Sequence, residues 1–229
     1  MSRKTRSERA KADSRINQTT LIGVAVAVVV LGIVAAEFWY QSDKAEPVAA
    51  VSAERQAALA SLHAPTLGDP GAKVHIVEFI DPACETCALF FPMVKKWMSE
   101  VPGDIRLSMR HAPFHDGSDY AVKILEASRE QGKYWQTLEA MLASQRQWTQ
   151  NHTVMPERIA PAIASVGLDM QQLLRDMNSV DILQRMEQDK KDAIVLKVTA
   201  TPEYFVNGRP LPSFGQQQLA DLVREELGK

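Results

Sequence analysis

The stretch Val74-His-Ile-Val-Glu-Phe-Ile-Asp-Pro-Ala-Cys84-Glu-Thr-Cys87 decides the fold of this chain. It opens with a run rich in β-branched and aromatic residues, which is typical of a buried strand, and then reaches an Asp-Pro break. Two cysteines follow in a C-x-x-C spacing, and a helical pattern continues from there to about Glu100. Pro92 lies inside that helix, where its ring removes a hydrogen-bond donor and predicts a kink. These are the only two cysteines among 229 residues, so all thiol chemistry of the chain belongs to this stretch.

The position of the two cysteines predicts redox chemistry. A C-x-x-C pair at the start of a helix places its first sulfur beside unpaired backbone N–H groups and the positive end of the helix dipole. That environment favours the thiolate, which is the form that attacks a disulfide, and the second sulfur lies one helical turn away. We therefore assign Cys84 as the exposed nucleophile and Cys87 as the resolving thiol. In the oxidised form the two would be bridged as a Cys84–Cys87 disulfide.

Three other interpretations of the pair remain open. A zinc site normally needs four ligands, and the five histidines of the chain are mostly scattered, with none beside the cysteines in a ligand pair. An inert structural disulfide would close a very short loop and would add little stability in the chain-entropy model. Two buried, unreactive thiols are the third possibility.

The sequence after the pair predicts a mixed α/β domain. Residues 105–109 alternate apolar and polar side chains as a second strand would, and a block at about 117–197 has mostly helical spacing. Residues 203–211 predict a hairpin, because their Asn-Gly pair suits a turn in which both central residues have positive φ. A capping box of Ser213 and Gln216 begins the last helix. The fold class is therefore α/β, with a small mixed sheet, helices on its faces and an inserted helical lobe.

Three segments precede this domain: a basic tail (residues 1–20), an almost entirely apolar run (residues 21–40) and a linker (residues 41–65). The apolar run has about the ~20 residues that a helix needs to cross a bilayer. The aromatic residues at its end suit the membrane–water interface, and the basic flank should stay in the cytoplasm. We predict an uncleaved transmembrane helix; the alternative is a cleaved signal peptide, whose apolar core is usually shorter.

The membrane segment and the charge distribution limit what the rest of the chain can do. Either an anchor or a signal peptide exports the remainder into a compartment where disulfides persist. The formal net charge is −2, and basic residues gather in the N-terminal tail. The main body therefore lacks the basic face expected of a nucleic-acid-binding protein.

Two motifs in the chain together resemble the thioredoxin superfamily. The first is Glu78-Phe-Ile-Asp-Pro-Ala-Cys84-Glu-Thr-Cys87, with a proline five residues later, and the second is Ala200-Thr201-Pro202-Glu-Tyr-Phe-Val-Asn-Gly208. The long helical insertion between them and the lead-in Thr66-Leu67-Gly68-Asp69-Pro70 are similar to DsbA-like bacterial thiol–disulfide oxidoreductases. The resemblance covers Thr66 to Leu227 and implies a thioredoxin fold in residues 66–229, with the helical insertion inside it.

The resemblance also implies roles for three residues outside the cysteine pair. Pro202 would be the family's cis-proline beside the cysteines, and Thr201 would face the sulfurs and hydrogen-bond to them. The alternative is an ordinary trans turn before a strand. Glu78 matches the family's buried acid, which would relay a proton to or from Cys87. The alternative is a strand glutamate that points into solvent.

The dipeptide between the cysteines, Glu85-Thr86, departs from the strongly oxidising relatives, which carry a histidine there. A carboxylate beside Cys84 disfavours the ionised thiol. A less stabilised thiolate implies a less oxidising disulfide. The expectation is therefore a moderate oxidant, an isomerase or a reductase. Ala200 and Lys197 stand where the family often has glycine.

The sequence thus predicts an exported, membrane-tethered thiol–disulfide oxidoreductase that acts on proteins with thiols or disulfides. A membrane redox partner would reset the pair, and neither a cofactor nor a metal is expected. We expect a single-pass protein of the bacterial inner membrane with its catalytic domain on the periplasmic side. The alternatives are a chaperone-like binding module and a protein that handles a soft metal such as Cu(I) through the same two thiols.

Overall fold

The computed structural model describes residues 53–60 and 62–228. The predicted basic tail and transmembrane helix, and residues 41–52 of the predicted linker, lie outside these residues. No helix within the described part of the chain is long and apolar enough to cross a membrane. The packed unit considered below begins at Glu54.

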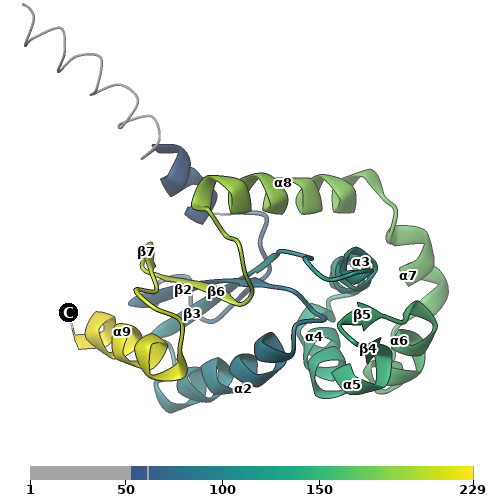
Figure 1. Cartoon of the computed structure of the whole chain (residues 1–229), viewed down its shortest axis with the longest axis horizontal. Helices are drawn as coiled ribbons and strands as arrows, with labels where there is room; N and C mark the ends of the chain where they lie inside the picture. The colour runs from purple at the N-terminus through teal and green to yellow at the C-terminus, as the bar shows by residue number, and fades with distance from the viewer. Residues whose placement is uncertain (1–52, 61, 229) are drawn as a thin grey trace, which may run out of the picture. The chain divides into compact units, whose positions relative to one another are not determined.

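A five-stranded mixed sheet forms the centre of this unit, with the strand order β1-β3-β2-β6-β7 (Figure 1). Strand β2 runs parallel to β3 and antiparallel to β6. Six of the seven side chains of β2 are buried, because helices cover both faces of the sheet, and this explains its nearly continuous apolar sequence. The strands are β1 (Thr66–Leu67), β2 (Val74–Ile80), β3 (Ile105–His111), β6 (Glu203–Val206) and β7 (Arg209–Pro210).

The predicted hairpin joins β6 to β7. Asn207 and Gly208 have φ values of 48° and 79°, as the Asn-Gly signal requires. The side chain of Asn207 also reaches the neighbouring strand, where its Oδ1 accepts a hydrogen bond of 2.8 Å from the backbone N–H of His75. The hairpin is therefore tied to the central strand as well as to itself.

Alternate residues of β2 face two separate apolar clusters, as the two-residue period of a strand requires. Ile76 and Ile80 pack in the larger cluster with α2 (Glu85–Glu100) and α9 (Gln216–Gly228). Val77 and Phe79 pack in the smaller cluster with the C-terminal part of α8 and with Ala58, which lies in the helix of residues 53–60. Helices α2 and α9 therefore lie on one face of the sheet, and α8 and the short helix lie on the other (Figure 1).

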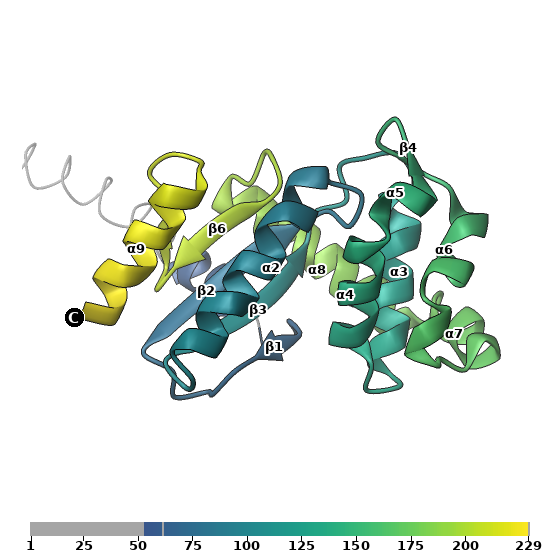
Figure 2. The same ribbon diagram turned by 90° about the horizontal axis from the view of Figure 1, so that it is seen from below.

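The helical lobe occupies the predicted interval and stands beside the sheet (Figure 2). It buries its own apolar side chains, among them the fully buried Trp148, and continues the larger cluster of the sheet. Its helices are α3 (Ser118–Arg129), α4 (Tyr134–Ala143), α5 (Gln145–Trp148), α6 (Pro156–Ala162), α7 (Met170–Asp176) and α8 (Val180–Leu196), and α5 and α6 are joined by the short hairpin of β4 (Thr149–Gln150) and β5 (Thr153–Val154).

The folded domain starts earlier than the predicted boundary at Thr66. Ala58 is only 3% exposed, because it packs on the sheet, and its carbonyl accepts a 2.8 Å hydrogen bond from the buried side chain of Arg110. Ala64 is buried as well, and Pro65 accepts a backbone hydrogen bond from Met109. The end of the predicted linker is therefore part of the domain, because its small apolar side chains cover one face of the sheet.

A buried charge network joins β3 to α8. Arg110 is fully buried and donates hydrogen bonds of 2.5 Å each to Asp189 and Asp192 of α8. Burial acts to raise the pKa of Asp189. Hydrogen bonds from His111 and His63, together with the positive charge of Arg110, lower that pKa well below its usual range. Buried charges are tolerated only when they are paired in this way. The network therefore fixes α8 on the sheet.

Candidate active site

Cys84 lies at the junction of the central strand and the first long helix. Strand β2 ends at Ile80, a three-residue turn follows, and Cys84 occupies the N-cap position of α2 in an extended conformation. The N-cap position leaves the first N–H groups of the helix without partners in the helix, and these groups point toward the sulfur. The strand–turn–helix arrangement predicted from the sequence is present here.

A buried carboxylate holds this turn in place. Asp81 is fully buried, and its Oδ1 accepts hydrogen bonds from the backbone N–H of Ala83 at 2.8 Å and the hydroxyl of Ser118 at 2.6 Å. Its Oδ2 accepts from the backbone N–H groups of Phe114 and His115, both at 2.8 Å, and lies 2.7 Å from the His115 ring. Asp81 thus joins the cysteine turn to the loop that follows β3 and to α3.

A side chain of the helical lobe holds the same turn from the other side. Gln145 at the start of α5 is almost fully buried, and its amide donates to the carbonyl oxygens of Pro82 and Cys84, at 2.7 and 3.0 Å. Neither Asp81 nor Gln145 was among the residues singled out from the sequence. The Asp-Pro pair was interpreted only as a strand break, and no local pattern relates Gln145 to a turn 61 residues earlier.

The two cysteines differ in their access to solvent. Both thiols are free, so the structure describes the reduced pair. Cys84 is 7% exposed and Cys87 is 0% exposed. The nucleophile expected to be exposed therefore presents only a small part of its surface, while the expected resolving thiol is entirely buried beneath it. A substrate sulfur would reach Cys84 first.

The thiol of Cys84 is unusually acidic. Its pKa is lowered to about 5, first by a hydrogen bond from the Cys87 thiol and then by the backbone N–H groups of Cys87 and Thr86 and the side chain of Thr201, against a rise from burial. Glu85 is exposed and is not among the causes of the shift. The expectation that Glu85 would leave the thiolate poorly stabilised is therefore corrected, because hydrogen bonds made directly to the sulfur outweigh an exposed charge.

The thiol of Cys87 is shifted in the opposite direction. Burial raises its pKa far above the ordinary range, and the hydrogen bond to Cys84 and the negative charges of Cys84 and Glu78 add to the rise. Cys87 is therefore a hydrogen-bond donor in the reduced pair and needs a base before it can attack. The opposite shifts have the directions that a nucleophilic Cys84 and a resolving Cys87 would need.

The second motif lies beside the pair, although it is 117 residues away in sequence. The Thr201–Pro202 bond is cis, as the resemblance implied. Pro202 is buried, and the Cys84 thiol donates a 3.3 Å hydrogen bond to the carbonyl oxygen of Thr201. Upstream, Lys197 adopts a positive φ of 60° at the end of α8, which explains why glycine suits this position in relatives.

Glu78 is buried beneath the pair and does not point into solvent. Its side chain is 0% exposed, and its Oε1 accepts a 3.0 Å hydrogen bond from the hydroxyl of Tyr204. Its Oε2 has no hydrogen-bond partner among the residues that the structure describes. Burial raises the pKa of Glu78 to about 8, against the hydrogen bond from Tyr204 and with a further rise from the charge of Cys84. A carboxyl group with this pKa exchanges protons near neutral pH.

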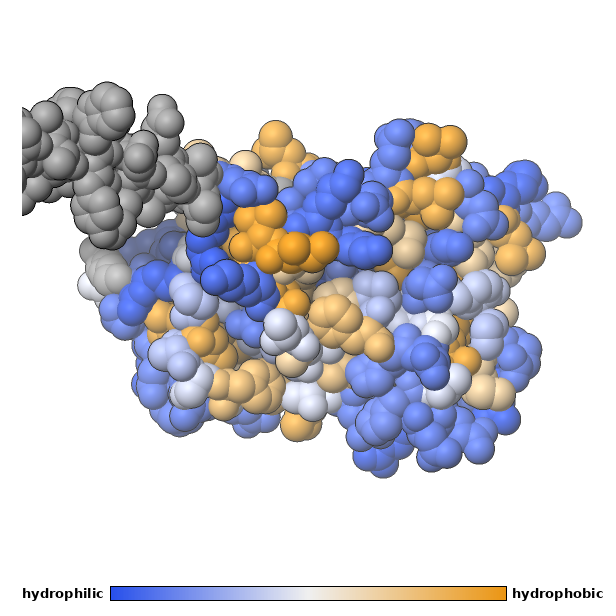
Figure 3. All heavy atoms as spheres, turned by 45° about the horizontal axis from the view of Figure 1, so that its top comes forward, coloured by the Kyte–Doolittle hydropathy of each residue, from blue (hydrophilic) through white to orange (hydrophobic). Residues whose placement is uncertain are grey.

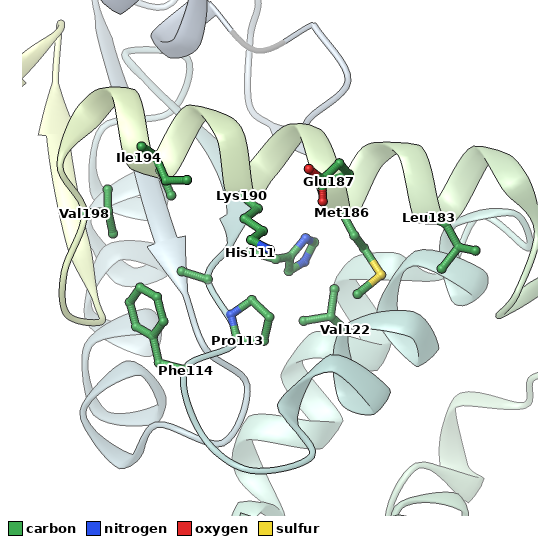
Figure 4. A pocket seen from close by; sticks show the side chains of 12 residues that line it. His111, Pro113, Phe114, Val122, Leu183, Met186, Glu187, Lys190, Ile194 and Val198 are labelled. Atoms are coloured by element: carbon green, nitrogen blue, oxygen red, sulfur yellow. The ribbon is translucent and has the colours of Figure 1, made fainter.

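Apolar side chains are exposed around and beyond the site. Phe214, which is 57% exposed, stacks on Phe90 of α2, and Leu89 is 63% exposed. On the face that carries α8, apolar patches lie among hydrophilic ones (Figure 3). A groove of about 640 Å³ lies there between α8 and the loop after β3, and it is lined mainly by apolar side chains such as Phe114 and Ile194 (Figure 4).

In residues 53–60 and 62–228, no three histidine, cysteine, aspartate or glutamate side chains are grouped as metal ligands.

The sequence model of the thioredoxin family matches residues 61–224. The chain belongs to this family. Among solved structures, it is similar to a thioredoxin-like oxidoreductase from Silicibacter pomeroyi DSS-3, with 30% identity, a TM-score of 0.64 and coverage of 75% of this chain and 96% of the other. It also shares the fold of BdbD from Bacillus subtilis, with 24% identity, a TM-score of 0.64 and coverage of 72% and 94%.

Curated relatives of this thioredoxin-family chain are of two kinds. The thiol:disulfide interchange protein DsbA of Azotobacter vinelandii is 28% identical over 156 residues, which are 64% of this chain and 67% of that protein. The Na⁺/H⁺ antiporter NhaA of Herminiimonas arsenicoxydans is 29% identical over 144 residues, which are 63% of this chain. The chain spans only 22% of that antiporter. Its homologues therefore include DsbA-like thiol–disulfide oxidoreductases, as well as part of an antiporter.

The acidity of Cys84 predicts its alkylation behaviour. The reduced protein should react with iodoacetamide at Cys84 with a midpoint near pH 5, because the thiolate is the reacting form. Cys87→Ala should raise this midpoint, since it removes the largest cause of the low pKa. Glu85→Gln is the matched control and should leave it almost unchanged. A wild-type midpoint near the free-cysteine value of about 8.5 would contradict the assignment.

Proposed function

We propose that the protein is an exported, membrane-tethered oxidoreductase that forms, reduces or isomerises disulfides in other proteins. One observation carries this proposal. The acidic thiol of Cys84 and the buried thiol of Cys87, which holds its proton strongly, lie at the start of one helix, and the Cys84 sulfur contacts the carbonyl oxygen of Thr201. A structural disulfide or a pair of inert thiols needs no such difference in acidity. Perturbed pKa values of this kind gather at sites that perform chemistry.

The geometry supports a two-step exchange. The Cys84 thiolate attacks a substrate disulfide, a mixed disulfide forms, and one substrate thiolate leaves. Cys87 then gives its proton to the free Oε2 of Glu78 and attacks the sulfur of Cys84. The Cys84–Cys87 disulfide forms, the second substrate thiolate leaves, and two electrons have passed to the substrate. The reverse sequence oxidises a substrate dithiol by the same steps.

The backbone segment just before β6 is at least partly exposed and suits a substrate chain. Thr201 carries its carbonyl next to Cys84 and is partly exposed, and Ala200 is exposed beside it. We propose that these two residues bind the main chain of the substrate while its sulfur meets Cys84. Protein substrates with thiols or disulfides are therefore the expected class, and a membrane redox partner would reset the pair after each cycle.

The low pKa of Cys84 favours the oxidising direction. Stabilising the thiolate stabilises the reduced form, and a more stable reduced form makes the disulfide a stronger oxidant. A pKa of about 5 lies between those of thioredoxin, about 7, and DsbA, about 3.5. Of the classes expected from Glu85, a moderate oxidant, an isomerase or a reductase, we therefore favour the moderate oxidant.

Equilibration with glutathione should give a reduction potential between those of thioredoxin, about −270 mV, and DsbA, about −120 mV. Thr201→Ala removes one of the groups that lower the pKa of Cys84, and it should make the potential more negative. The two redox forms are quantified by thiol alkylation after acid quenching. A wild-type potential more negative than that of thioredoxin would contradict an oxidising role.

Single-cysteine variants test the exchange itself. Cys87→Ser should accumulate mixed disulfides with substrate proteins, because the resolving thiol is gone, and these should appear as reducible bands on non-reducing gels. Cys84→Ser should abolish exchange and form no such adducts, because the remaining thiol is buried and non-acidic. If both variants kept the function of the wild type, the thiols would be dispensable.

That outcome would favour a second candidate, a chaperone-like binding module. The apolar groove between α8 and the loop after β3 is the observation in its favour, because large exposed apolar surfaces often bind other proteins.

One observation supports membrane tethering. Residues 21–40 are almost entirely apolar and follow a basic tail. We propose that this run anchors the chain in the bacterial inner membrane with Cys84 on the periplasmic side.

In fractionated cells, the full chain should remain with the membranes after an alkaline wash, and a variant lacking residues 1–40, if exported by a cleavable signal, should be soluble. A membrane-impermeant maleimide should label Cys84 in spheroplasts without lysis. A shortened wild-type chain in the soluble periplasmic fraction would instead show cleavage and contradict the anchor.

A further inference from the structure

In the described part of the chain, a single side chain, that of Tyr204, hydrogen-bonds to the buried acid Glu78. Strands β2 and β6 are antiparallel, and Glu78 and Tyr204 are directly paired in their register. Cross-strand partners point to the same face of a sheet. The hydroxyl of Tyr204 accordingly donates a 3.0 Å hydrogen bond to Glu78 Oε1, inside the protein. The carboxylate would otherwise have to lose its hydration without compensation.

The ring of Tyr204 is fixed by packing. It is 0% exposed and stacks on Phe90 of α2 with a centroid distance of 6.1 Å and an interplanar angle of 26°. Phe90 lies one turn after Cys87 on the same helix and is itself covered by Phe214 at 5.0 Å. The hydroxyl therefore cannot swing away from Glu78 without disturbing the packing between α2 and the sheet.

We propose that Tyr204 is a positioning residue for thiol–disulfide exchange. Its hydroxyl donates a hydrogen bond to Oε1 of Glu78 and so keeps the carboxyl group ionisable. Oε2 is then left free to take the proton of Cys87. This role rests on the proposed function and adds to it a residue that neither motif predicted. Tyr204 acts through Glu78 and does not touch the substrate.

The chemistry of the two groups determines which of them takes the proton. Burial and the charge of Glu78 raise the pKa of Tyr204 well above its ordinary range, so Tyr204 keeps its proton and can only donate a hydrogen bond. The proton leaves Cys87, the Cys87–Cys84 bond forms, the substrate sulfur departs as a thiolate, and the proton stays on Glu78. It passes to solvent or to the departing thiolate afterwards, so the step balances without another reactant.

Four titratable groups interact with Glu78. Cys84 and Cys87 come from α2, Tyr204 from β6 and Tyr134 from α4. Of the four, only Tyr204 stabilises the carboxylate by a hydrogen bond, while a Cys84 thiolate opposes it. Loss of the tyrosine hydroxyl should therefore raise the pKa of Glu78 further above about 8.

The test is Tyr204→Phe in the reduced, full-length protein, because this change removes the hydroxyl and keeps the stacked ring. A hydrogen bond to a charged group predicts a rise of roughly one to two units in the pKa of Glu78, followed by the carbon-13 signal of its carboxyl group. In single-turnover exchange, the rate of the resolving step at pH 7 should fall about tenfold or more, because less carboxylate is available. The alkylation midpoint of Cys84 should move little.

Two comparisons separate this role from a purely structural one. Tyr134→Phe removes another buried tyrosine hydroxyl, one bonded to His111 and not to Glu78, and should leave the titration of Glu78 nearly unchanged. In a Glu78→Gln background, Tyr204→Phe should cause no further loss of the resolving rate, because the group through which it acts is gone. Equal losses in both backgrounds would overturn the proposal.

The possible failures are distinguishable. An active wild type in which Tyr204→Phe leaves the Glu78 titration unchanged overturns the role of Tyr204 and leaves the proposed function standing. A wild type without any exchange overturns both. A shifted titration together with a slower resolving step and a normal Cys84 midpoint supports both.

Discussion

The hydrogen bonds of one buried carboxylate, Asp81, determine where everything else in the site can lie. Its two oxygens receive donors from the cysteine turn, from the loop after β3 and from α3. The turn that presents Cys84 is therefore held by a segment at least 33 residues later in the sequence, and Gln145 holds it from the helical lobe. The helical insertion is thus a structural part of the site, and the sheet alone would not hold the cysteines as they are.

Two acids near the pair show how environment separates roles. Glu78 lies in β2 and Asp81 lies just after the end of that strand, three residues later, and both are fully buried. Asp81 is surrounded by donors, so it serves as a fixed anchor point. Glu78 has one donor and one unpartnered oxygen, and its pKa rises to about 8. The sequence shows two similar carboxylates; only the count of donors around each shows that one is structural and one is suited to exchange protons.

Sequence patterns predicted those elements whose signals are local. The period of β2, the capping position of Cys84 and the Asn207-Gly208 turn were each readable within a few residues. The approach of Thr201 to Cys84 came from resemblance to a family. The roles of Asp81, Gln145 and Tyr204 could not be predicted, because their partners are 33 to 126 residues away and depend on the finished packing. The prediction from Glu85 about the acidity of Cys84 was wrong, because the neighbouring residues in sequence do not show which hydrogen bonds the Cys84 sulfur receives in the folded protein.

The order of the segments along the chain has a consequence for biogenesis. The cysteines emerge from the ribosome more than a hundred residues before Thr201 and Tyr204, which complete their surroundings. Until β6 has joined β2, the carboxylate of Glu78 has no cross-strand partner and Cys84 lacks the groups that Thr201 supplies. An unfolded chain thus carries two ordinary thiols. The reactive pair comes into being only when the C-terminal strands close the domain.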